Sequence, residues 1–466
     1  MSLATRIRRN GLGVLAGLGV LSVSLGAGAT SSQAQTLDAA LAAAYANNPT
    51  LNSQRAGTRA VDEKVPQALS GYRPTLFGSV SAGREYQRMK ASGKVVDGSL
   101  WPRAFVLTAT QSLFDGFVTA NSTRNAEMQV RGARETLRNT EQTVLLDAVT
   151  AYMNVIQAIA LLDLQQQNRT ALEQELRSTR DRFNVGEVTR TDVAQAEARV
   201  ADAQFQVSQA VANLTAARAV YRQVIGVEPG RLASPRSVEP MIPKSVDRVV
   251  SAGLSNHPAV KASQFAVDAA QFQVKVAEGA LMPNLNVQGQ AMASYEPSLS
   301  ASQSHSAAVT LNLTVPFYQG GVEYATIRQA KELWTQTRIE VDVNRDTVRA
   351  AAVQAWGALE ASKVQIEAAQ SAVAASTLAL EGVREEWRVG QRTTTDVLNA
   401  QRELTSSRAA LVTAQRDRVV AAYTLVAIIG RLDAISLGLK VRVYNPAVHY
   451  QQVRDSWAGV RTPDGK

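Results

Sequence analysis

The chain contains the same turn-like stretch twice. Residues 183–193 read FNVGEVTRTDV, and residues 387–397 read WRVGQRTTTDV. Their glycines, Gly186 and Gly390, are 204 residues apart. Two long copies indicate one duplicated domain, because solenoids are built from more and shorter units.

The duplication extends well beyond these turns. NNPTL at 47–51 matches NHPAV at 256–260 with an offset of 209, whereas LFDG at 113–116 matches FYQG at 317–320 with an offset of 204. Length changes settle in exposed loops. We therefore expect a loop of different length in each copy, between residues 76 and 113 in the first.

Each copy reads as helix, two strands, long helix, turn and helix. Pro74 ends the first helical segment, 37–69. Apolar and polar side chains then alternate on either side of a polar loop, which predicts a β-hairpin at about 75–114 and its counterpart at about 284–316. The polar face in the second copy carries Asn, Gln and Thr without charge, which is typical of a lumen wall opposite a lipid-facing surface. An ordinary half-buried hairpin of a soluble protein is the alternative.

The helices have matched lengths. The segment 117–183 predicts a helix roughly 100 Å long, and its partner, 191–225, one about 50 Å long. The opening helix, 37–69, is also about half length, so the two short helices stacked end to end match the long one. The sequence therefore predicts a rod of antiparallel helices, with strands at one end and two turns at the other.

The N-terminal residues have the pattern of a secretory signal. RIRR at 6–9 precedes the apolar stretch 11–29, and Ser32-Gln33-Ala34 is a small-x-small cleavage site. An uncleaved anchor helix is the alternative. Beyond this segment we expect no other long apolar run, and the best candidate, 419–430, is too short to cross a bilayer as a helix.

Composition excludes several classes of protein. The absence of cysteine excludes disulfides, Cys-ligated metals and a lipid-anchored N-terminal Cys. The net charge of +9 is dispersed among acidic residues, so it does not indicate nucleic-acid binding. His257, His305 and His449 are far apart in sequence, and His257 in its NHP turn has a structural interpretation. No motif for catalysis, a metal or a cofactor is present, so we expect no enzyme activity.

The strands require a shared assembly. About four strands cannot close a barrel, since known barrels have about eight or more. An open sheet edge cannot face lipid. We therefore expect the barrel to be shared among copies of the chain, with about eight strands in a dimer or twelve in a trimer, and the helices to continue it as a tube.

The duplicated plan, both Pro-started strand pairs and the two turn motifs resemble the TolC family of outer-membrane efflux and secretion ducts. The continuation of the second turn, DVLNAQ at 396–401, is the most specific part of this resemblance. The lack of a lipid-anchor Cys is similar to the TolC branch, and the C-terminal tail YNPAVHYQQVRDSW is similar to alphaproteobacterial members. An exported structural coiled-coil protein without a pore is the rival interpretation.

The resemblance implies a mainly α-helical homotrimer with a twelve-stranded membrane β-barrel and a periplasmic tunnel. It implies an outer-membrane exit duct for type I protein secretion, multidrug efflux or both. Its partners would be outer-membrane lipid, a periplasmic adaptor (membrane fusion protein) and an inner-membrane ABC or RND-type transporter. The segments would be a signal peptide at 1–34, a first repeat at 35–226, a linker at 227–245, a second repeat at 246–430 and an equatorial tail at 431–466.

The turn residues are candidate site residues. Gly186 and Gly390 end long helices, where glycine allows a left-handed cap, and the resemblance implies adaptor docking at these tips. Asp192 and Asp396, with the threonines that precede them, open the returning helices. Helix N-terminal stabilisation is a sufficient role for such residues.

The resemblance also implies an aperture lock. Thr191 and Asp192 of the first turn would bond with Trp387 and Arg392 of the second and hold the aperture shut. The family usually has Tyr at the aromatic position, and Trp387 donates only through its indole N–H.

Two further residues concern selectivity. Three copies of Asp396 would form a carboxylate ring that favours cations in the lumen. Asn399 stands where related channels often carry a second Asp, so a double ring is not expected.

Overall fold

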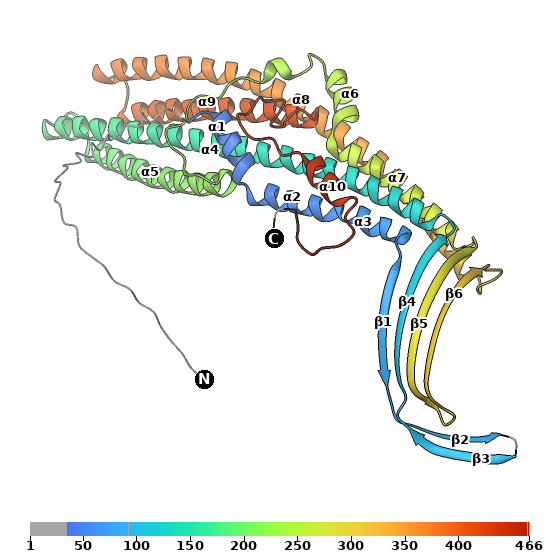
Figure 1. Ribbon diagram of the computed structural model, residues 1–466. Helices are drawn as coiled ribbons and strands as arrows, with labels where there is room; N and C mark the ends of the chain where they lie inside the picture. Colours follow the sequence, from blue (N-terminus) through green and yellow to red (C-terminus); the bar gives the residue numbers. More distant parts are fainter. Residues whose placement is uncertain (1–34, 92, 464, 466) are drawn as a thin grey trace, which may run out of the picture.

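The computed structural model describes residues 35–91, 93–463 and 465. The predicted signal peptide at 1–34 lies outside the described residues. The chain forms an elongated rod of helices that ends in a curved sheet (Figure 1). The fold is mainly α-helical and duplicated, as the sequence indicated.

The two long helices run the length of the rod. They are α4 (Val118–Asn184) and α8 (Val322–Arg388), of 67 residues each, and each is about 100 Å long at 1.5 Å per residue. The half-length helices α5 (Arg190–Ile225) and α9 (Thr394–Ile428) return from the tips. Each returning helix packs against the long helix before it, and α4 also packs against α9 (Figure 1).

The prediction of one opening helix over 37–69 is wrong, because the segment is three helices. These are α1 (Leu37–Asn47), α2 (Pro49–Asp62) and α3 (Lys64–Leu69). Asn48 has extended backbone, since a residue before proline is disfavoured in the helical region. Its Oδ1 accepts hydrogen bonds from the N–H groups of Thr50 and Leu51 and caps α2.

The second repeat has the same break. There α6 (Val246–Asn256) ends before α7 (Pro258–Gly279). His257 Nδ1 accepts from the Ala259 N–H at 3.2 Å and caps α7. The structural interpretation of His257 is therefore confirmed.

The sheet has four antiparallel strands in the order β1-β4-β5-β6. They are β1 (Thr75–Ala82), β4 (Arg103–Phe114), β5 (Asn284–Ser298) and β6 (Ala301–Thr314). The expected loop in the first hairpin instead contains β2 (Glu85–Ala91) and β3 (Lys94–Leu100), paired as a separate ribbon. Within the part of the chain that the structure describes, β1 and β6 each have one partner strand, so the sheet has two open edges.

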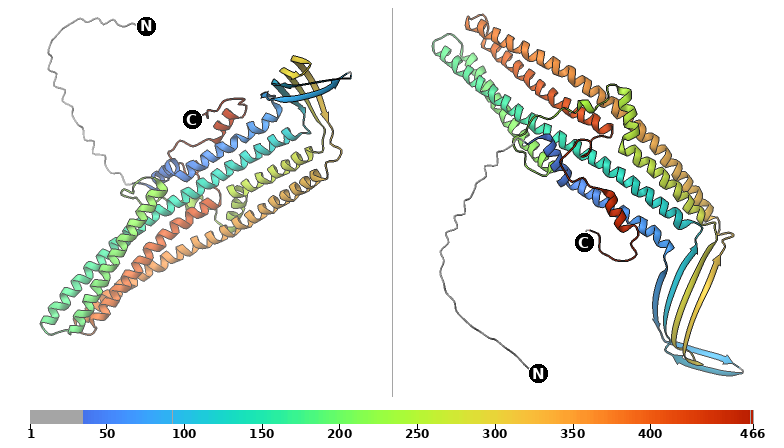
Figure 2. Two further views of the ribbon diagram at one scale, coloured as in Figure 1. Left: turned by 90° about the horizontal axis from the view of Figure 1, so that it is seen from below. Right: turned by 45° about the horizontal axis from the view of Figure 1, so that its top comes forward.

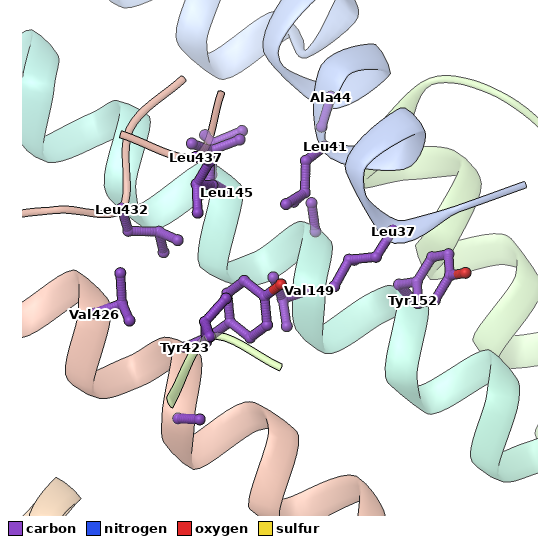
Figure 3. Close-up of a cluster of buried hydrophobic side chains, with 14 of the residues drawn as sticks. Leu37, Leu41, Ala44, Leu145, Val149, Tyr152, Tyr423, Val426, Leu432 and Leu437 are labelled. Atoms are coloured by element: carbon purple, nitrogen blue, oxygen red, sulfur yellow. The ribbon is translucent and has the colours of Figure 1, made fainter. Parts of the chain in front are cut away.

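The main apolar core lies at the middle of the rod, where the half-length helices end. Figure 3 shows α1, α4, α9 and the tail converging there, with Leu41, Leu145, Tyr423 and Leu432 buried among them. The Tyr152 hydroxyl donates to the Gln35 carbonyl at 2.8 Å or the Ala233 carbonyl at 2.6 Å. This core joins both repeats and the residues that follow each of them.

One apolar window of α4 is long enough to cross a membrane by length and composition, so the expectation that no long apolar stretch follows the N-terminal segment is wrong. Half of that window is buried inside the protein. Val149, Tyr152 and Val155 of this helix belong to the core. The window is therefore a core segment of the rod.

The linker contains a 3₁₀ turn (Glu239–Met241), and another (Ser70–Tyr72) precedes β1. The C-terminal tail carries α10 (Pro446–Val453), which packs beside α2 (Figures 1 and 2). Its His449 Nδ1 lies 3.0 Å from Asp62 Oδ2, and both residues are buried. The tail is thus anchored along the first repeat.

Candidate functional site at the helical tips

The two turn motifs lie at the end of the rod opposite the sheet (Figure 2). Gly186 and Gly390 have φ of +80° and +78°, the left-handed conformation expected for them. A Cβ at either position would meet no heavy atom within 4 Å. The turns are therefore exposed, and backbone conformation rather than crowding favours glycine there.

Each returning helix begins with a capping box. Thr189 Oγ1 accepts from the Asp192 N–H at 3.3 Å, and Asp192 Oδ2 accepts from the Thr189 N–H at 2.9 Å. Thr393 and Asp396 repeat this arrangement at 3.3 Å and 3.0 Å. The caps are therefore Thr189 and Thr393, two residues before the expected Thr191 and Thr395, because the carboxylate must lie at the third helical position to reach back.

The capping geometry also affects ionisation. The backbone N–H and hydroxyl of Thr393 donate to the Asp396 carboxylate and hold its pKa below the ordinary value. Donors to the charged form of a carboxyl favour that form. Asp396 is therefore an anion at neutral pH.

Trp387 is mostly buried within the second hairpin. It packs with Leu380, Val397 and Leu404, and its indole N–H donates to Thr394 Oγ1 at 3.4 Å. Arg392 Nε lies 2.7 Å from Glu386 Oε2 on the same hairpin. Both residues of the second turn thus have partners in their own hairpin.

The structure does not join the four proposed lock residues within one chain. Over residues 35–91, 93–463 and 465, no hydrogen bond or ion pair connects Thr191 or Asp192 with Trp387 or Arg392. Thr191 is exposed, and the Asp192 carboxylate is engaged by Thr189. A lock between these residues would have to form between neighbouring copies.

A different contact joins the two hairpins near their tips. The Arg182 guanidinium of α4 lies 4.3 Å from the centre of the Trp387 ring of α8. Arg182 Nε also contacts Glu187 Oε2 at 2.9 Å. Sequence reasoning missed this contact, because the position of the second repeat that is equivalent to Arg182 is occupied by Glu386.

The contacts between the first hairpin (α4 and α5) and the second (α8 and α9), here called the seam, are largely polar. Asn168 Oδ1 of α4 accepts from Gln401 Nε2 at 3.3 Å and from Thr405 Oγ1 at 3.0 Å. Closer to the tip, Arg199 donates to Asn399 Oδ1 at 3.3 Å. Water can replace such hydrogen bonds at little cost. The seam can therefore shift more readily than the interior of each hairpin.

Further polar and apolar contacts complete this seam. Thr395 donates to the Gln195 side chain, and Arg416 Nη2 donates to Asn154 Oδ1 at 2.7 Å near the core. An apolar cluster of Leu172, Ala203 and Leu398 lies between these levels. Asn399 thus belongs to the seam, where it accepts a hydrogen bond from the first hairpin.

Comparison with known proteins gives a consistent result. The model of the family described as "Outer membrane efflux protein" matches residues 40–227 and 249–431. Each matched range coincides with one repeat of the fold.

Among curated proteins, outer membrane efflux protein BepC of Brucella suis is 43% identical over 435 residues, which cover 93% of each chain. Outer membrane protein TolC of Escherichia coli is 25% identical over 89% of this chain and 86% of its own. The alkaline protease secretion protein AprF of Pseudomonas aeruginosa is 25% identical over 72% of this chain and 70% of its own.

The fold is that of solved outer-membrane channels. The Campylobacter jejuni CmeC channel superposes with a TM-score of 0.74 at 17% sequence identity, covering 90% of this chain and 89% of its own. At that identity the likeness concerns the fold.

Proposed function

Because this chain belongs to the outer membrane efflux protein family, we propose that its paired tips form a gate on the periplasmic side of the duct. The protein is an outer-membrane channel of the TolC type with a helical tunnel in the periplasm. It is an exit duct for efflux or type I secretion. Its relatives are channel proteins rather than enzymes.

The open edges of the sheet are the observation that carries this function. The four strands alternate in direction, so β6 of one copy can pair antiparallel with β1 of the next. Three copies give twelve strands in a closed ring, which removes the edges that lipid does not accept. The homotrimer therefore forms the barrel.

The same symmetry brings six tip turns to one aperture. Thr191 and Asp192 of one copy then face Trp387 and Arg392 of a neighbour, and their bonds hold the aperture closed. This lock requires Arg392 or Asp192 to exchange an existing partner, since each is engaged within its own hairpin. The exposed Arg392 ion pair is weak enough for that exchange.

Asp396 supplies three carboxylates near this aperture. Its lowered pKa keeps the ring charged and favours cations. Asn399 is neutral and hydrogen-bonded to Arg199. It therefore supplies no second carboxylate ring and instead contributes a hydrogen bond between the two hairpins.

Adaptor docking is assigned to the tips around Gly186 and Gly390. Both turns are exposed and nearly identical in conformation, so an adaptor hairpin finds six similar sites on one trimer. The inner-membrane partner is an ABC or RND-type transporter.

The cargo is tested by removing the gene. We expect small-molecule efflux from the 43% identity with an efflux protein, so the deletion strain should become drug-sensitive with an unchanged extracellular proteome. Loss of one or a few secreted proteins instead would identify type I secretion, which the similarity to AprF also supports. Purely monomeric protein that is soluble without detergent would refute the duct and favour a coiled-coil protein without a pore.

A further inference from the structure

A cavity of about 350 Å³ lies between α2, α4 and the C-terminal tail. The tail runs beside α2 in both views of the rod and covers this part of the first repeat (Figure 2). The polar side chains around the cavity include three arginines, two tyrosines and two acids. None of the tip residues discussed above contributes to it.

The arginines differ in how they are partnered. Arg138 donates to the Gly430 carbonyl at 2.8 Å and lies within 3.9 Å of Asp433 and 3.7 Å of Glu135. Arg55 donates through Nη1 to Asn52 Oδ1 at 2.8 Å, but its buried Nη2 has no hydrogen-bond partner among the described residues. Arg138 is therefore satisfied, whereas Arg55 is not.

Arg134 has even fewer partners. Its Nε and Nη2 atoms are both buried without a hydrogen-bond partner in the described part of the chain. The buried hydroxyl of Tyr444, on the tail, has none there either. Asp62 attracts Arg134 electrostatically, but no hydrogen bond joins them. A buried donor without an acceptor is unfavourable, so four such donor atoms around one cavity favour the binding of an acceptor there.

Aromatic rings hold these guanidinium groups in place. Arg55 lies 4.4 Å from the ring centre of Tyr45 and 5.4 Å from that of Tyr444. Arg134 lies 5.1 Å from the ring centre of Tyr450. A contact with the face of a ring occupies none of the guanidinium N–H groups in a hydrogen bond, so these donors stay available to a ligand.

In the described part of the chain, the two acids at the cavity make no hydrogen bond to Arg55 or Arg134, although Arg55 attracts the Glu141 carboxylate. Glu141 accepts from the Ala434 N–H at 2.8 Å, and burial raises its pKa. Asp433 accepts from the Ser436 N–H at 2.7 Å and contacts Arg138. With three arginines and two acids, the lining of the cavity has a positive formal net charge.

The second repeat provides an internal comparison. A cavity of about 510 Å³ between α7 and α8 occupies the equivalent place, with Arg338 at the position of Arg134. Gln264 replaces Arg55 there, and Asp342 replaces Arg138. Among the described residues, those that line this second cavity all belong to α7 and α8, so the C-terminal tail does not cover it. The second cavity also has two arginines, Arg338 and Arg345, and Arg338 lies 5.3 Å from the ring centre of Trp334. The first cavity therefore differs in having Arg55 on α2 and in being covered by the C-terminal tail.

We propose that the cavity beneath the C-terminal tail binds an oxyanion between Arg55 and Arg134, with the Tyr444 hydroxyl as a third donor. The oxyanion is the carboxylate or phosphate group of a small solute. Guanidinium groups bind such groups in a bidentate manner. The volume is at the lower end for small-molecule sites. Binding would tie the tail to α2 and α4.

The position of the cavity identifies the source of the solute. Arg134 is 16 residues beyond Val118, the first residue of α4, and thus roughly 24 Å from the sheet end of that helix. Lipid headgroups at the sheet do not reach it. The solute therefore comes from the aqueous space around the helices.

The test uses the purified full-length trimer in detergent and two probes, inorganic phosphate and succinate, against chloride at matched ionic strength. We expect saturable broadening of the phosphate ³¹P signal or a saturable rise in Tm with at least one probe. Binding of phosphate alone or succinate alone identifies the anionic group, and each supports the proposal.

Variants separate binding from general salt effects. Arg55→Gln and Arg134→Gln should abolish the saturable change, and Arg55→Lys should weaken binding about tenfold because the guanidinium fork is lost. Arg338→Gln, at the equivalent place in the second repeat, should retain it. Phosphate also stabilises proteins nonspecifically, so an equal rise in Tm in all variants, or no saturable change with either probe, overturns the proposal. If Arg134→Gln does not fold, Arg55→Gln and Arg55→Lys still decide it.

Discussion

The contact between Arg182 and Trp387 offers the most direct test of how the tips are held together. It joins α4 of the first hairpin to α8 of the second at 4.3 Å. We expect Arg182→Gln to loosen the hairpins against each other. The closed aperture should then open more often.

The expected magnitude follows from burial. Cation–π contacts contribute about 0.5–1 kcal/mol at exposed sites and about 2 when desolvated. Trp387 is 9% exposed and the Arg182 side chain 23% exposed, which places this contact at about 1–2 kcal/mol. The ion pair with Glu187, whose side chain is 58% exposed, adds less than about 1 kcal/mol.

Such a loss changes the ratio of open to closed apertures by about 5- to 30-fold per subunit. Single-channel recording in planar bilayers measures this as a higher open probability or conductance. Arg180→Gln is the matched control, because Arg180 pairs with Glu197 at 2.6 Å within the first hairpin only. Equal behaviour of the Arg182 variant and wild type, or an equal effect of the control, would refute the reasoning.

Three other predictions concern the gate and the core. Arg392→Ser should raise single-channel conductance if Arg392 contributes to the lock between copies, and unchanged conductance would count against that lock. Because the pKa of Asp396 is lowered, its negative charge and its helix-capping contribution should be fully present above the ordinary carboxyl pKa and be lost as pH falls through the lowered pKa. Reversal potentials in planar bilayers at pH 5 should therefore show a cation preference that Asp396→Asn reduces. An unchanged preference in that variant would exclude the carboxylate ring. Tyr152→Phe should lower the free energy of unfolding by about 1–3 kcal/mol, since it leaves the buried carbonyls of Gln35 and Ala233 without the hydroxyl donor. Denaturant unfolding measures this change. An unchanged midpoint would show that water replaces the hydroxyl group.

Some features missed from the sequence had local signals. Asn48 precedes Pro49 and His257 precedes Pro258, which is a sufficient reason to break each opening helix. The capping boxes were equally readable, because Thr189 and Asp192 have the required spacing of three. These errors concerned boundaries that a closer local reading would have found.

The sequence by itself determined the duplication, the order of helices and strands, the left-handed glycines at the tips and the family. These depend on periodicity, proline and glycine, whose effects act over a few residues. It also placed Trp387 and Arg392 in the second turn motif, but it did not indicate their partners within the chain. The tertiary structure alone decided that Arg182 lies on Trp387, that Asn399 belongs to the seam, and that Arg55, Arg134 and Tyr444 surround one cavity. Such contacts join residues that are tens to hundreds of positions apart, and they depend on the rotation and offset of packed helices, which no local pattern specifies.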